Sequence, residues 1–134
     1  KAPAGVGEAK TGPGRMMDIE LVAQAGALLS GSGARDVATG LDGAVACGWL
    51  DAAEGSRLAQ AYRLFWSVQT AARLLSAKAL DTAAIGEGGA QFLCRSTGFE
   101  TLQGLEQDLE DSYAACRAMI DGALDREGAN GADE

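Results

Sequence analysis

The sequence lacks the residues on which most hydrolytic enzymes depend. It has no histidine, so neither a Ser-His nor a Cys-His nucleophile pair can form. Its three cysteines, Cys47, Cys94 and Cys116, form no Cys-x-x-Cys pair, which leaves a zinc site only scattered thiols. An odd number of cysteines does not suit a disulfide framework, so we expect a cytoplasmic protein with buried core thiols.

Long apolar runs and clusters of positive charge are also missing. The formal net charge is -8, and no run of Lys or Arg could follow a phosphate backbone, so nucleic acid is not an expected partner. The apolar stretches fall short of the roughly 20 residues that a membrane span needs. The first residues, KAPAGVGEAK, contain no apolar region of a signal peptide. We therefore expect no membrane partner either.

The residues that are abundant favour helices. The 134 residues are 47% hydrophobic but only 5% aromatic, which predicts one domain rich in Ala and Leu rather than a sheet. We predict an all-α fold, a helical bundle of about five helices with one long central helix. Residues 1–12 should be a linker, residues 13–126 the bundle and residues 127–134 a disordered tail.

The spacing of apolar residues predicts where the helices lie. The first should run from about Pro13 to Gly31, a short one from about Arg35 to Cys47, and the last from about Glu100. Asp51 and Glu54 match a capping box that opens the long helix. The apolar positions of that helix recur at intervals of three and four: Leu58, Ala61, Phe65, Val68, Ala72 and Leu75. The segment GEGG, residues 86–89, lacks the Lys and Ser/Thr of a P-loop and should be a hinge.

One stretch, KTGPGRMMDIELVAQ at residues 10–24, brings a Gly-Pro-Gly loop to a helix whose first turn carries Asp18 and Glu20. The N–H groups at such a helix start could face a phosphate, and the carboxylates could help to hold Mg²⁺ or a basic partner. The alternative is that the acids only favour the helix dipole. Residues two apart on a helix point about 200° apart, so Asp18 and Glu20 cannot grip one ion together.

This stretch resembles the family of glutamine synthetase adenylyltransferases. In that family a nucleotidyltransferase core is followed by a helical domain that opens with a Lys, a Gly-Gly-hydrophobic-x-Asp-Ile-Glu-Phe stretch and a Gln. Arg15 stands in place of the second Gly, and Leu21 in place of the Phe. The likeness extends over most of residues 10–125. The matching residues are Lys10, Gly14, Met16, Asp18, Ile19, Glu20 and Gln24.

The resemblance implies the C-terminal helical module of an enzyme that uses ATP and Mg²⁺ to adenylylate a tyrosine of glutamine synthetase. Its partners would be an upstream nucleotidyltransferase domain, glutamine synthetase and the PII signal protein. No Gly-Ser followed by Asp-x-Asp occurs here, so we expect the catalytic and metal residues upstream and predict that this fragment is inactive alone. Residues expected at the nucleotide cleft or domain junction are Lys10, Gly14, Arg15, Asp18 and Glu20.

Two alternatives stay open. One is the helical domain of a PII uridylyltransferase, a related enzyme that shares the domain type. The other is a helical protein-interaction module with no catalytic connection. For that role the long helix offers Arg63, Trp66 and Arg73 as candidates for a partner surface, although they also suit a solvated rim around the core.

Overall fold

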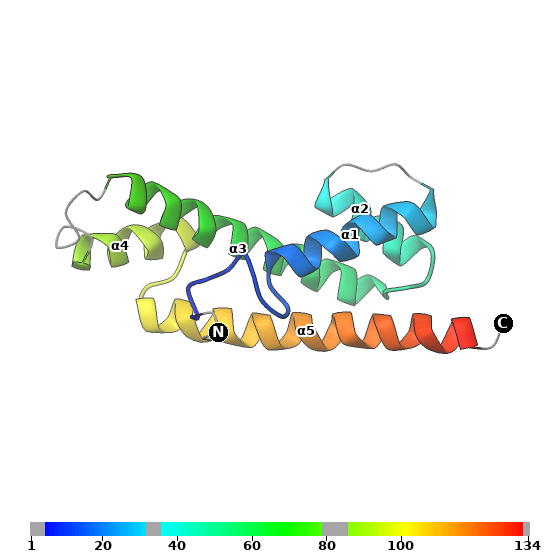
Figure 1. Cartoon of the computed structure of the whole chain (residues 1–134). Coiled ribbons are helices and arrows are strands. Elements are labelled where there is room, and N and C mark those ends of the chain that lie inside the picture. Colours follow the sequence, from blue (N-terminus) through cyan, green and yellow to red (C-terminus); the bar gives the residue numbers. More distant parts are fainter. Residues whose placement is uncertain (1–4, 32–35, 79–85, 133–134) are drawn as a thin grey trace.

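The computed structural model describes residues 5–31, 36–78 and 86–132, and every regular element among them is an α-helix (Figure 1). The predicted all-α fold is therefore confirmed, with helices in the expected order. Their bounds are α1 Met16–Ser30, α2 Val37–Ala46, α3 Ala52–Lys78, α4 Gly86–Thr97 and α5 Leu102–Ala132.

The two long helices, α3 and α5, form the frame of the molecule, with α4 at one end and α1 and α2 towards the other (Figure 1). The predicted capping box opens α3: the N–H of Glu54 donates to Asp51 Oδ1 at 2.7 Å, and the N–H of Asp51 donates to Glu54 Oε1 at 3.0 Å. Apolar side chains from α1, α2, α3 and α5 meet in one core. Its largest fully buried members are Phe65, Ile19, Leu41, Leu58, Leu105, Leu109 and Cys116.

Glycines let α1 and α2 pack backbone to backbone. A Cβ atom on Gly26 would clash with the carbonyl oxygen of Gly40, and one on Gly40 would clash with that of Ala23. The two helices therefore approach more closely than ordinary side chains allow, and the short helix α2 packs directly on the backbone of α1.

The turn between α2 and α3 is fixed to the C-terminal half of α5. The indole N–H of Trp49, which is buried, donates to the carbonyl oxygen of Ala123 at 2.8 Å. Arg126 Nη2 donates in return to the carbonyl oxygen of Trp49 at 3.0 Å and to Glu54 at 3.1 Å. These bonds set the position of α2 and of the beginning of α3 relative to α5.

Some predicted boundaries differ from the structure. α1 begins at Met16 and not at Pro13, because Gly12 and Gly14 have positive φ values of 128° and 72°, which interrupt a helix. The predicted hinge at residues 86–89 is wrong, since these residues form the first turn of α4. α5 continues to Ala132, beyond residue 126, because helix propagation adds a hydrogen bond per residue and no proline stops it.

Two predictions about burial are also wrong. Cys47 is exposed at the end of α2, whereas Cys94 and Cys116 are buried as expected. Ala71, not Ala72, carries the buried stripe of α3 past Val68. The cause is the same in both cases. Cys47 lies at the end of a helix and Ala72 near the end of a row of apolar residues, and there the neighbouring helices no longer cover every apolar residue.

Candidate functional site

The loop that precedes α1, residues 5–15, lies against α5 and is called the N-terminal loop below. The hydroxyl of Tyr113 on α5 donates to the carbonyl oxygen of Val6 at 2.8 Å. Gly14, in the loop, is buried against the same helix. A Cβ atom on Gly14 would clash with the carbonyl oxygen of Tyr113 and stand 2.8 Å from the backbone nitrogen of Arg117. The glycine of the motif is thus required by close packing of two backbone segments.

Arg15 is enclosed by this loop. Its guanidinium carbon lies 4.1 Å from the ring centroid of Tyr113, and its Nη1 donates to the carbonyl oxygens of Gly5, at 2.7 Å, and of Glu8. Burial raises the pKa of Tyr113 to about 12, although the charge of Arg15 acts in the opposite direction. In this arrangement the guanidinium holds the N-terminal loop together and faces an aromatic ring.

The start of α1 is closed by the same loop. The N–H groups of Met16 and Met17 donate to the carbonyl oxygens of Ala9 and Lys10, both at 3.0 Å. The carboxylate of Asp18 accepts the N–H of Gly14 at 2.9 Å. The first two N–H groups that an anion at this helix start would need are therefore bonded to the chain itself.

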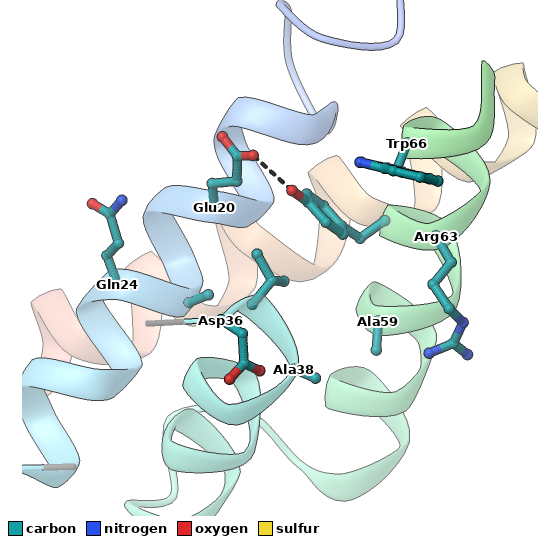
Figure 2. A pocket seen from close by; sticks show the side chains of 10 residues that line it. Glu20, Gln24, Asp36, Ala38, Ala59, Arg63 and Trp66 are labelled. Atoms are coloured by element: carbon teal, nitrogen blue, oxygen red, sulfur yellow. Dashed lines mark hydrogen bonds between the residues drawn. The ribbon is translucent and has the colours of Figure 1, made fainter. Parts of the chain in front are cut away.

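Glu20 lies on the other side of α1. Its Oε2 accepts the hydroxyl of Tyr62 on α3 at 2.7 Å (Figure 2). Burial raises the pKa of Tyr62 to about 12, and the hydrogen bond and negative charge of Glu20 add to the shift. Asp18 and Glu20 consequently have separate partners, in agreement with their spacing on a helix.

A pocket of about 660 Å³ opens beside Glu20, between α1, the beginning of α2 and α3 (Figure 2). It combines carboxylates, an amide, a hydroxyl, a guanidinium and an indole. Its lining residues are Glu20, Ala23, Gln24, Asp36, Val37, Ala38, Ala59, Tyr62, Arg63 and Trp66.

Asp36 gives the pocket a second negative charge. It is the N-cap of α2, where its carboxylate accepts the N–H of Thr39 at 2.8 Å and the hydroxyl of Thr39 at 2.9 Å. These hydrogen bonds lower the pKa of Asp36 below its ordinary value.

The structure regroups the residues selected from the sequence. Glu20 shares the pocket with Arg63 and Trp66, which the sequence placed in a separate group. Gly14, Arg15 and Asp18 lie instead at the N-terminal loop, and Lys10 is exposed there. Arg73 is exposed further along α3 and does not line the pocket.

Three polar residues of the pocket were not selected as site residues: Gln24, Asp36 and Tyr62. Gln24 is one of the residues that carry the family resemblance, and Tyr62 is adjacent to the selected Arg63. The sequence therefore contained a signal that could have identified both. Asp36 could be found only as a helix cap. A pocket between three helices is not visible in the periodicity of any one of them.

The residues present do not fit a magnesium-nucleotide site of the kind implied for the whole enzyme. Among the described residues no group of three or more His, Cys, Asp or Glu side chains lies close enough to hold a metal ion. Asp18 and Glu20 face different partners, and the N–H groups of Met16 and Met17 at the start of α1 are occupied. We therefore derive no catalytic step at this junction.

The comparisons with known proteins place the chain in a family. The model of the GlnD PII-uridylyltransferase family matches residues 7–126. The chain belongs to this family. A search of curated proteins and a search of solved structures each found no match. Membership of the PII-uridylyltransferase family supports the alternative of the helical domain of a PII uridylyltransferase, within a group of related nucleotidyltransferases, and not specifically an adenylyltransferase.

The family match covers both the N-terminal loop from residue 7 and the three helices of the pocket. None of the helices in the described part of the chain has the length and apolar character that a membrane span requires.

Proposed function

We propose that this chain is the helical module of a nucleotidyltransferase that transfers a uridylyl group to the PII signal protein. The observation that carries the proposal is the family match, which includes all but the last residues of the helical fold. In this proposal the chemistry of transfer, with UTP and Mg²⁺, belongs to the nucleotidyltransferase core of the enzyme and not to its helical module.

In this proposal the module binds the protein substrate and positions it for the transfer. The N-terminal loop, residues 5–15, is packed on α5 through Gly14, Arg15 and Tyr113, so this loop has a fixed position relative to the helices. The pocket beside Glu20 opens to the solvent, which suits the recognition of a protein substrate.

A second candidate is the adenylylation of glutamine synthetase with ATP. It is favoured by the sequence pattern from Lys10 to Gln24, in which Asp18, Ile19 and Glu20 stand as in the adenylyltransferases. The two candidates share a helical module and differ in nucleotide and target, so the function of the module in positioning a protein substrate is common to both.

The test compares this chain with a longer polypeptide, which also contains the residues that its gene encodes before Lys1. Each is incubated with Mg²⁺ and either labelled UTP and PII or labelled ATP and glutamine synthetase. Label on PII, only with the extended polypeptide, is the expected result. Label on glutamine synthetase from ATP would establish the second candidate instead. Transfer to neither target would overturn both and leave a helical interaction module.

A further inference from the structure

We propose that the pocket between α1, α2 and α3 binds an arginine side chain of a protein partner, with its guanidinium against Glu20 and the aromatic face formed by Tyr62 and Trp66. The proposal rests on the proposed function in one respect, that the partner is a protein. The charge of the pocket, its aromatic side chains and the surface of α1 beside it all favour such a ligand.

The charges of the pocket favour a cation. Among the described residues that line the pocket, Glu20 and Asp36 supply two carboxylates against one guanidinium, that of Arg63. A carboxylate can accept about four hydrogen bonds, and Tyr62 uses one on Glu20. In Figure 2 the guanidinium of Arg63 points away from Glu20 and Trp66, which leaves the Glu20 side of the pocket negative.

The aromatic residues favour a planar cation. Trp66 is 55% exposed although it lies beside a pocket, and the ring of Tyr62 is held in place by the bond to Glu20. A guanidinium can stack on an indole or phenol face while its N–H groups donate to a carboxylate, whereas an ammonium is a strongly hydrated point charge. The pocket therefore suits arginine better than lysine.

The surface beside the pocket favours a protein segment over a free small molecule. Met17, Leu21 and Leu28 are exposed on α1, with Leu21 at 61% and Leu28 at 84%. Gln24, which lines the pocket, lies three residues after Leu21 and four before Leu28, so all share one face of the helix. A segment that inserts an arginine beside Gln24 would cover these apolar side chains on either side.

The experiment follows the two indole N–H signals of the ¹⁵N-labelled 134-residue chain by NMR. The probe is N-acetylarginine amide, and the neutral control of the same shape is N-acetylcitrulline amide. Trp66→Phe assigns the signals. We expect a saturable shift of the Trp66 signal in the millimolar range, because one side chain makes few contacts. Trp49, buried and bonded to Ala123, should not shift.

Variants locate the binding site. Glu20→Gln keeps an acceptor for Tyr62 and removes the charge, so affinity should fall about tenfold, as for one lost charge-assisted hydrogen bond. Asp36→Asn keeps a good helix cap and should weaken binding about threefold. The matched control is Glu110→Gln, an exposed carboxylate on α5, which should leave the affinity unchanged.

Three results would overturn the proposal. The citrulline probe could shift Trp66 as much as the arginine probe, which would exclude recognition of charge. N-acetyllysine amide could bind as tightly, which would exclude a guanidinium site. Glu20→Gln could leave the affinity unchanged, which would place any binding elsewhere. None of these assays uses nucleotide or PII, so this proposal and the proposed function can fail separately.

Discussion

Two sides of one helix differ in how they use the same short motif. On the side of Asp18, the N-terminal loop lies between α1 and α5. There Asp18 accepts the N–H of Gly14, and Gly14 packs against the backbone of α5. On the side of Glu20, two residues later, a pocket of about 660 Å³ stays open between three helices. Residues that read as one site in the sequence therefore belong to two environments.

The difference teaches that a loop-to-helix junction rich in glycine and acids can be structural on one side and available on the other. A helix turns about 100° per residue, so a spacing of two sends side chains to nearly opposite faces. For this reason Asp18 takes part in the packing of the N-terminal loop, whereas Glu20 lines the pocket. The predictions that follow disturb one side and observe the other.

The largest expected effect comes from crowding the closed side with Gly14→Ala. The new methyl group would clash with the backbone of α5, and the φ of 72° is unfavourable for alanine. We expect a loss of about 3 kcal/mol or more in the free energy of unfolding, measured with urea. Gly31→Ala is the control: its φ is 68°, but nothing lies within 4 Å, so it should cost only about 1 kcal/mol.

Alkaline pH should loosen both sides. Burial raises the pKa of Cys116 to about 11, and those of Tyr62 and Tyr113 to about 12, from ordinary values of 9 and 10. The folded chain then holds protons that the unfolded chain releases, so the stability is complete below pH 9 and falls as the pH rises from 9 to 12. Urea unfolding at pH 8 and pH 10.5 measures this fall. Equal stability at both values would contradict it.

Tyr113→Phe should loosen the closed side alone. It removes the hydroxyl that donates to Val6 and keeps the ring beneath Arg15, so the cost should be about 1 kcal/mol. Amide hydrogen exchange in residues 5–15 should become faster. The arginine probe should bind with unchanged affinity, and a weaker affinity would show that the two sides are coupled.

The smallest effect concerns the cysteines. A thiol reagent at neutral pH should modify Cys47 first, because it is exposed, without a measurable change in the unfolding transition. Cys116 should react only on unfolding, since it is buried and its pKa is raised to about 11. Mass spectrometry of the labelled peptides gives the order, and early labelling of Cys116 would contradict the packing of α5.

Much of the fold could be predicted from single-helix patterns. The capping box at Asp51 and Glu54 forms both of its expected bonds, and the apolar positions of α3 from Leu58 to Val68 are buried. These features depend on residues three or four apart, which the sequence shows directly. Predictions at the ends of stripes and elements failed: Cys47 was expected in the core and is exposed at the end of α2.

The candidate site could be predicted only in part. Glu20, Arg63 and Trp66 were selected, but their meeting depends on how α1 packs across α3, which involves positions more than 40 residues apart, as in the bond from Tyr62 to Glu20. Gly14 was expected at the nucleotide cleft or domain junction. Its contact with the backbone of α5 could not be predicted, because that backbone lies about 100 residues further along the chain.

The most direct test of the division between the two sides is to compare Asp18→Ala with Glu20→Gln by urea unfolding and by the arginine-probe titration. We predict that Asp18→Ala lowers the free energy of unfolding by about 2 kcal/mol, from loss of the bond to Gly14, and leaves the affinity unchanged. Glu20→Gln should change stability by less than about 1 kcal/mol and weaken the affinity about tenfold. Weaker binding in Asp18→Ala, with unchanged binding in Glu20→Gln, would contradict the account.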